Sequence, residues 1–300
     1  MMKKMKKSRY SPLTIALLAV LCLYVVAMVA LFLWGINTAM TDDFLQYRKS
    51  VIKLAWPISI HTNVFAILKE AVIPGIKGAE FRIWDVFFHS VLYAVGCALA
   101  KATVTCVTAY LCARYAYKIS KIIYTVVLVS MMIPIVGSLP SEIQIANTLG
   151  LYNQIWGMWI MRSNFLGLYF LIFYEQFKAM PKSFSEAAEI DGANDWRIMV
   201  SIAMPLIKFT FLSVLLIYFI EYWNDFLVPL ALMPAKPTAA YALHVLYNTG
   251  GSVMEGAEHT LQNPPYVITF GLTIAAPIII LFVACNKQLL GNLSVGGVKG

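Results

Sequence analysis

The stretch SFSEAAEIDGANDWRIMVSIAMPL, residues 183–206, is rich in charged and polar side chains although it lies between long apolar segments. Ser183 followed three residues later by Glu186 is the capping-box pattern, in which each side chain accepts a hydrogen bond from an amide of the first helical turn. Gly192 is the residue type that helices favour directly after their last turn. Asn194 or Asp195 can cap a second helix, which we expect to enter the next apolar segment at Pro205. The stretch therefore predicts a helix, a glycine turn and a second helix.

The rest of the chain has the composition of an integral membrane protein. Of its 300 residues, 60% are hydrophobic and only 13% are charged, whereas about a quarter are charged in soluble proteins. The first apolar run, 12–36, is long enough to cross a bilayer and lacks a convincing cleavage site, so we interpret it as a retained signal anchor. The five cysteines form no CxxC pair, so neither a disulfide framework nor a metal site is predicted. The net charge of +8 is dispersed over loops, which argues against binding to nucleic acid.

Hydropathy predicts an all-α membrane protein with six transmembrane helices, at 12–36, 86–114, 121–140, 151–177, 207–233 and 265–285. Fourteen lysines and arginines lie in the tails and loops on the side of the N-terminus and seven lie on the other side, so the positive-inside rule predicts an N-in, C-in topology. Residues 183–206 then face the cytoplasm between spans 4 and 5. We expect two parts, an anchor span with a long outer loop in 1–85 and the remaining five spans in 86–300, with the two short helices at 183–197.

The spacing within residues 183–206 resembles the EAA signature of the membrane subunits of bacterial ABC importers, EAA-x3-G-x9-I-x-L-P. Met204 stands where the signature has leucine, which is a volume-conserving exchange. Further stretches of residues 85–300 are similar, in the same order, to the MalG-type permeases of carbohydrate importers, although His89 stands where these permeases usually have asparagine. These stretches are FHSVLYA (88–94), AYLCARYA (109–116), ANTLGLYNQIWG (146–157), MPKSFSEAAEIDGA (180–193), WNDFLVPL (223–230) and GGVKG (296–300).

The resemblance implies a multi-pass permease subunit of the bacterial plasma membrane, with residues 86–300 as its ABC importer transmembrane domain. Its implied partners are a second homologous permease subunit, a dimer of ATP-binding subunits and an extracytoplasmic solute-binding protein. It also implies that the EAA loop forms coupling helices that sit in a cleft of the ATP-binding subunit. The residues of this joint would be Glu186, Ala187, Ala188, Gly192, Ile202 and Pro205.

The sequence contains no recognisable motif for binding and hydrolysing ATP. A Walker A loop needs the pattern G-x4-G-K-[ST], and GNLSVGGVKG at 291–300 does not supply it. We therefore expect no catalytic residue and no cofactor on this chain, and expect ATP and Mg to be bound by the partner subunits.

Polar side chains inside the predicted spans are candidates for a substrate path, because a charge at membrane depth costs about 2.5–3.5 kcal/mol on insertion scales. One interpretation pairs Lys101 or Arg162 with Glu221 or Asp225 as structural ion pairs. The other has the same groups line a wet cavity that binds sugars or oligosaccharides, and both can hold. Two buried cations suggest, more narrowly, an acidic glycan such as a uronate-containing oligosaccharide. The candidates are Lys101, Arg162, Asn164, Glu221, Asn224 and Asp225.

Three other functions are considered: an ABC permease for a non-sugar solute, a secondary transporter driven by an ion gradient, and an intramembrane enzyme. Secondary transporters often have two matching halves, which this sequence does not show. The sequence contains no HExxH or GxSxG motif that would indicate an enzyme. The last predicted outer loop either contacts the binding protein or faces solvent; its candidate contact residues are His244, Glu255, Glu258 and His259.

Overall fold

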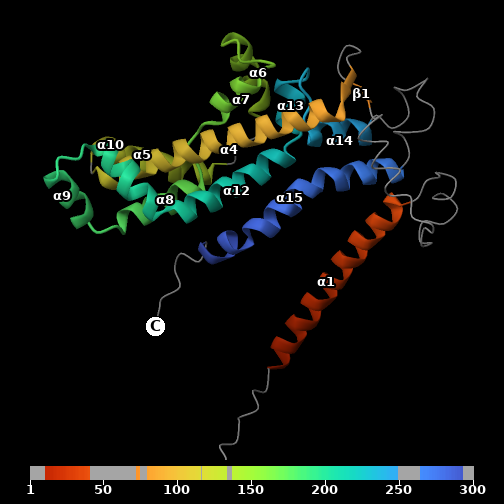
Figure 1. Cartoon of the computed structure of the whole chain (residues 1–300), viewed down its shortest axis with the longest axis horizontal. Helices are drawn as coiled ribbons and strands as arrows, with labels where there is room; N and C mark the ends of the chain where they lie inside the picture. Colours follow the sequence, from red (N-terminus) through yellow and green to blue (C-terminus); the bar gives the residue numbers. More distant parts are fainter. Residues whose placement is uncertain are drawn as a thin grey trace, which may run out of the picture. The chain divides into compact units, whose positions relative to one another are not determined.

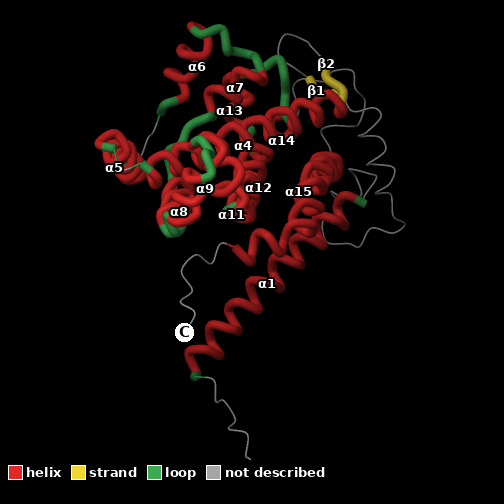
Figure 2. Tube along the Cα trace, turned by 60° about the vertical axis from the view of Figure 1, so that its left-hand side comes forward, coloured by secondary structure: helices red, strands yellow, loops and turns green. Residues whose placement is uncertain are grey.

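The chain is almost entirely helical in a computed structural model that describes residues 11–40, 72–74, 80–115, 117–133, 137–248 and 264–292 (Figure 1). The predicted all-α class is confirmed for these residues apart from one short antiparallel hairpin (Figure 2). Its strands are β1 (Val72–Pro74) and β2 (Glu80–Arg82), with Ile73 opposite Phe81. Most of the predicted long outer loop around this hairpin lies outside the described residues, as do Glu255, Glu258 and His259.

The helices follow one another along the chain as α1 (Pro12–Ala39), α4 (Ile83–Arg114), α5 (Lys118–Met132), α6 (Leu139–Thr148), α7 (Ile155–Arg162), α8 (Leu168–Lys178), α9 (Ser183–Ile190), α10 (Asp195–Ile198), the π-helical turn η2 (Met199–Ala203), α11 (Met204–Leu206), α12 (Lys208–Asn224), α13 (Leu227–Leu232), α14 (Ala239–Asn248) and α15 (Pro264–Asn292).

Three helices of the described residues are long and apolar enough to cross a membrane by themselves: Leu13–Ala39, Ile83–Arg114 and Val267–Cys285. A fourth crossing follows if the segments Asp195–Leu206 and Lys208–Asn224, which meet at 79°, are counted as one span. Nearly all side chains of α1 are apolar, and those from Leu13 to Trp34 are almost all exposed, as expected for a helix surrounded by lipid. The protein is therefore a helical membrane protein.

The chain divides into two compact units, residues 1–70 with 254–273 and residues 71–253 with 274–300. In the first unit the Thr269 hydroxyl lies 3.4 Å from the carbonyl oxygen of Ala39, next to the end of α1. The second unit contains every helix from α4 to α14 and the last part of α15. The predicted division at residue 85 stays a prediction.

Helix α4 forms the centre of the second unit, where it packs against α12, α8 and α7. The buried face of α4 carries small side chains four residues apart, which allow neighbouring helices to approach closely. These are Ala94, Ala98, Ala102 and Cys106. The indole Nε1 of Trp223 on α12 donates to the Ile274 carbonyl at 3.2 Å and ties α15 to this core.

The three middle spans predicted as single segments are interrupted in the structure. The segment 121–140 contains most of α5 and the start of α6, the segment 151–177 contains α7 and most of α8, and the segment 207–233 contains α12 and α13. Each break has a local cause. Gly167, with φ 126°, precedes α8, and Pro140 and Pro229 lie in the first turns of α6 and α13, where a proline is tolerated because its missing amide has no helical partner. Hydropathy averages over such breaks and therefore missed them.

A close helix contact in the core generates a stability prediction. Gly96 of α4 lies against the indole ring of Trp159 of α7, whose Nε1 donates to the Leu92 carbonyl at 3.0 Å. A Cβ atom at position 96 would collide with that ring, so Gly96→Ala should displace Trp159 and cost about 1–3 kcal/mol of stability. We expect a lower midpoint of thermal unfolding for the purified protein in detergent.

Gly35→Ala is the matched control, because no heavy atom lies within 4 Å of a Cβ atom added there. It should leave the midpoint unchanged. Equal midpoints for the two variants would contradict the packing described for Gly96 and Trp159.

Candidate functional site

The segment 183–206 forms the predicted helix, glycine turn and helix, but its first helix does not start as predicted. The N-cap of α9 is Lys182 rather than Ser183, and no side chain caps the helix, so the predicted capping box of Ser183 and Glu186 is wrong. The physical reason is that the amides of Ser185 and Glu186 already bond the Lys182 carbonyl, both at 3.0 Å. The helix therefore begins before Ser183.

The glycine turn closes α9 with a Schellman motif. Gly192 adopts φ 77°, the left-handed conformation that favours glycine. The Gly192 amide donates to the Glu189 carbonyl at 3.0 Å, and the Ala193 amide donates to the Ala188 carbonyl at 2.9 Å. Asn194 then caps α10, because its side-chain oxygen accepts from the Arg197 amide at 2.9 Å. The role of Gly192 as the turn is thus built into the backbone.

The second helix runs from α10 through η2 to α11 and stops at Leu206. Pro205 has no amide to donate. The amide of the residue before it, Met204, bonds the Met199 carbonyl five residues back, which produces the π-helical turn. The helix then meets α12 at 79°, so a sharp bend follows the predicted entry into the next span at Pro205. Met204, the departure from the signature, places its Sδ atom 3.5 Å from Sγ of Cys106 on α4.

The predicted coupling residues differ in their exposure. Glu186, Ala187, Gly192 and Pro205 are exposed, whereas Ala188 and Ile202 are half-buried. No residue of α9 is buried. Apolar side chains next to the acidic ones are also uncovered on α9 and α10: Phe184, Trp196 and Ile190, the last 86% exposed. A short helix with exposed apolar and acidic side chains is a surface that another protein can cover.

Two contacts fix this surface to the end of α4. The guanidinium of Arg114, the last residue of α4, lies 3.1 Å from the Glu189 carboxylate of α9. The second is a hydrogen bond from the Tyr115 hydroxyl to the Asp195 carboxylate of α10; partial burial and this bond raise the pKa of Tyr115 to about 12. Figure 1 shows α9 and α10 at one end of the helical bundle, opposite the end that carries α14 and β1.

The polar residues predicted in the spans separate into three groups. The first is an ion pair between α4 and α12, in which Nζ of Lys101 lies 3.8 Å from a carboxylate oxygen of Glu221. The same ammonium lies 4.5 Å from the ring centre of Tyr218 and 5.6 Å from that of Tyr222. The predicted pairing of Lys101 with a carboxylate of the fifth span is therefore present.

Arg162 forms the second group with a partner that the sequence analysis missed. It ends α7, and its guanidinium lies 2.5 Å from the carboxylate of Glu142 in α6, so the predicted pairing of Arg162 with Glu221 or Asp225 is not found. The reason is that the break between α7 and α8 removes Arg162 from a continuous span. An acidic residue in the first turn of a short helix begun by Leu139 and Pro140 was the available signal for Glu142.

The third group is hydrogen-bonded to helix ends. The Asp225 carboxylate accepts from the Tyr93 hydroxyl at 2.8 Å and from the Val228 amide at 3.2 Å, at the junction of α12 and α13. The Asn164 carbonyl lies 3.3 Å from the Thr105 hydroxyl, in the break before α8. Asn224 is exposed and its side-chain amide donates to the Ile220 carbonyl at 2.8 Å. Glu221 and Asn224 thus remain together on an exposed part of α12, whereas Asp225 and Asn164 form hydrogen bonds at helix ends.

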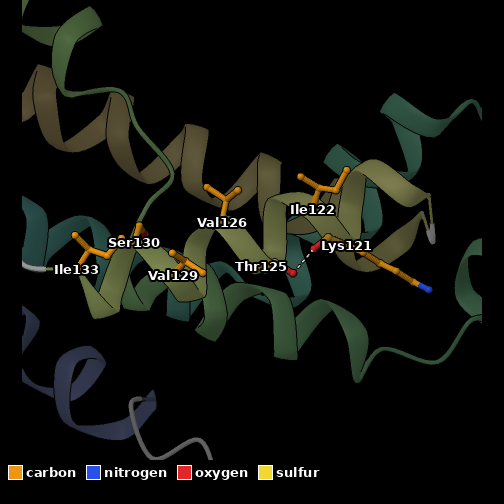
Figure 3. Close-up of a pocket in the computed structure, with 7 residues that line it drawn as sticks. All are labelled: Lys121, Ile122, Thr125, Val126, Val129, Ser130 and Ile133. Atoms are coloured by element: carbon orange, nitrogen blue, oxygen red, sulfur yellow. Dashed lines mark hydrogen bonds between the residues drawn. The ribbon is translucent and has the colours of Figure 1, made fainter.

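A groove of about 530 Å³ follows α5 (Figure 3). Its walls are almost wholly apolar, and its two hydroxyl groups are turned back to the helix, with Thr125 donating to the Lys121 carbonyl at 2.9 Å and Ser130 to the Val127 carbonyl at 2.8 Å. The lining residues are Lys121, Ile122, Thr125, Val126, Val129, Ser130 and Ile133. Such a groove offers no catalytic chemistry. Within the described part of the chain, no three His, Cys, Asp or Glu side chains are placed to hold a metal ion.

Known proteins resemble this chain in sequence and in fold. The chain is 26% identical over 226 residues to the diacetylchitobiose uptake system permease protein NgcG of Streptomyces coelicolor, covering 72% of this chain and 70% of that protein. It is 27% identical over 280 residues to the lactose transport system permease protein LacG of Rhizobium radiobacter, covering 86% and 96%.

A solved structure has the same fold. It is a bacterial ABC transporter involved in the import of the acidic polysaccharide alginate, and a chain of it matches with a TM-score of 0.74 and 18% identity over 94% of this chain and 99% of that chain. Residues 105–289, which include the whole of the segment 183–206, match the family of the binding-protein-dependent transport system inner membrane component. Because this match spans more than half of the sequence, the chain belongs to that family of inner-membrane permease components.

Proposed function

We propose that the chain is one of two membrane subunits of an ABC importer for sugars or oligosaccharides, acidic glycans included. The observation that carries the proposal is the exposed helix–turn–helix of residues 183–206, fixed to the end of α4 by Arg114 and Glu189. The relatives named for uptake of diacetylchitobiose and lactose support a carbohydrate as the cargo. Uptake of labelled oligosaccharides by the complete complex in proteoliposomes, with amino acids and peptides as control solutes, tests this assignment.

In this proposal the ATP-binding subunits bind α9, and Gly192 forms the turn that sets the angle between α9 and the following helix. The exposed residues Phe184, Ile190 and Trp196 supply apolar contact area, and Glu186 supplies charge. ATP and Mg are bound by the partner subunits. Movement of those subunits reaches the transmembrane body through α4 and α12, the two helices that the segment 183–206 contacts and continues into.

The proposed topology has six membrane crossings with both chain ends inside. Three crossings are the long helices, and the other three are the broken segments that contain α5, α7 with α8, and α12 with α13. The contact of Arg114 with Glu189 supports this topology, because it brings together two segments that the charge distribution assigns to the same, cytoplasmic side. An extracytoplasmic binding protein would deliver the cargo at the opposite end, near α14.

The proposed pathway follows the breaks in the middle spans. Irregular backbone at membrane depth is tolerated where protein covers it or where it lines a cavity, and transporters use broken helices for this purpose. The exposed part of α12 with Glu221 and Asn224, backed by Lys101, would face that cavity together with the equivalent surface of the second permease. Arg162, Asn164 and Asp225 would shape the pathway by holding the helix ends.

The topology generates a labelling prediction. Ile190 of α9 is 86% and Tyr247 of α14 is 76% exposed, and these two helices lie at opposite ends of the second unit (Figure 1). A cysteine introduced as Ile190→Cys should react with a membrane-impermeant maleimide in inside-out vesicles and not in intact cells or spheroplasts. Tyr247→Cys is the matched control and should show the reverse. Labelling of Ile190→Cys from the outside would refute the proposed orientation and with it the coupling role of α9.

The glycine turn generates a prediction about coupling. Gly192→Val places a β-branched side chain at φ 77°, which costs about 1–3 kcal/mol of strain, and we expect the backbone to relax by changing the angle between α9 and α10. The variant should lose co-purification with the ATP-binding subunits and at least about tenfold of its uptake rate, because each 1.36 kcal/mol lost from the coupled state is a factor of ten.

Gly150→Val is the matched control, since Gly150 has φ 67° and free space around it but lies in the turn between α6 and α7. Both variants should lower thermal stability by similar amounts, and only Gly192→Val should detach the ATP-binding subunits. Retained subunits and uptake in Gly192→Val would remove the coupling assignment.

A further inference from the structure

We propose that Lys101 recognises a carboxylate of the transported glycan, and that Glu221 occupies the place of this carboxylate while no substrate is bound. The inference rests on the proposed carbohydrate function and narrows it to acidic oligosaccharides of the uronate type. It assigns Lys101 to substrate binding and Arg162 to stabilisation of the fold.

The two ion pairs differ in how easily they can open. In the pair of Arg162 and Glu142 the atoms lie 2.5 Å apart, and the side chains are only 19% and 26% exposed. Opening that pair would leave two covered charges without a partner, which is strongly unfavourable. In the pair of Lys101 and Glu221 the atoms lie 3.8 Å apart, and the Glu221 side chain is 55% exposed. The Glu221 carboxylate can therefore move away from Lys101 without becoming buried and unpaired.

The Lys101 ammonium stays in place when Glu221 leaves. Aromatic rings hold it, with the ring centre of Tyr218 at 4.5 Å and that of Tyr222 at 5.6 Å. Tyr218 is itself fixed by an edge-to-face contact with Tyr169, with ring centroids 5.0 Å apart. A ring face attracts a cation but carries no net charge. The ammonium, whose side chain is 15% exposed, therefore still needs an anion at this depth in the membrane.

A substrate carboxylate satisfies that need by giving Lys101 a new anionic partner. It replaces the Glu221 carboxylate on Lys101, one carboxylate for another. The released Glu221 side chain then lies beside Asn224 on the exposed part of α12, where carboxylate and amide oxygens can accept hydrogen bonds from the hydroxyl groups of the same sugar. A neutral sugar offers hydroxyl groups for Glu221 but nothing that can replace it on Lys101.

This exchange predicts opposite effects for the two charges, whereas a purely structural ion pair predicts the same effect for both. If the pair only stabilises the helices, removing either charge leaves the other unpaired and impairs the protein similarly. If Glu221 competes with the substrate for Lys101, then removing Glu221 should strengthen binding of an acidic glycan, and removing Lys101 should weaken it.

The test uses the complete complex, with both permease subunits, the ATP-binding subunits and the binding protein, in proteoliposomes. The probes are oligogalacturonides and alginate oligosaccharides of two to four units, and the same molecules after reduction of their carboxyl groups to alcohols; lactose and diacetylchitobiose are further neutral probes. Initial rates over a range of concentrations give KM and kcat. Calorimetry on the isolated binding protein separates its selectivity from that of the permease.

We expect the unmodified complex to carry an acidic probe. Lys101→Gln should raise the KM for that probe by about tenfold or more, the loss of one charge-assisted contact, without a matching change for its reduced form. Glu221→Gln should lower the KM for the acidic probe severalfold. Lys121→Gln, which removes a lysine from the start of α5, is the control for a general loss of positive charge and should change neither.

Other outcomes overturn the inference in distinguishable ways. Transport of neutral probes alone would overturn the role of Lys101 and leave the proposed carbohydrate function standing, whereas transport of no probe at all would count against both. An equal loss of uptake in Lys101→Gln and Glu221→Gln would favour the structural ion pair. If a single variant fails to assemble, Lys101→Met with Glu221→Met leaves no unpaired charge, and it should still show the raised KM for the acidic probe.

Discussion

The hydrocarbon core of a membrane offers no water to an exposed backbone amide, carbonyl or charge, and this constraint governs the second unit of the protein. Its middle spans are interrupted, and at two of the interruptions polar side chains bond the backbone. At the break after α7, the Ser163 hydroxyl donates to the Ile160 carbonyl at 2.6 Å. At the break after α12, the Asp225 carboxylate receives both the Val228 amide and the Tyr93 hydroxyl. The polar residues that lower the hydropathy of these spans therefore stabilise the irregular backbone by hydrogen bonding to it.

The same constraint explains why the covered cations Arg162 and Lys101 are each paired with a carboxylate, and the two pairs differ in tightness. Arg162 and Glu142 join α7 to α6 across a short, covered contact, which suits two helices that must keep their positions. Lys101 and Glu221 join α4 to α12 through a longer contact at an exposed edge. Helix α4 packs along α12 over much of its length, so their association does not depend on this one pair. The looser pair can therefore open without separating the two helices.

Much of the architecture could be predicted from the sequence because it follows from local rules. The long apolar runs of α1, α4 and α15 were recognisable by length alone, and Gly192 with Asn194 indicated the turn between two helices. The start of α9 was missed because a backbone carbonyl, that of Lys182, took the place of a side-chain cap. Glu142 was missed because its importance arises only when α6 folds back to Arg162, a contact between separate helices that no local pattern encodes.

The right-angled junction at Ile207 has a mechanical consequence. A helix that meets the next one at 79° cannot push along its axis, so a displacement of residues 195–206 acts on α12 as a torque. Ile207 is only 5% exposed and is held between two helices, as the fulcrum of a lever should be. The short arm is stiffened by continuous helix, and the long arm carries Glu221 at its far end. A small tilt of residues 195–206 would thus produce a larger lateral displacement of Glu221.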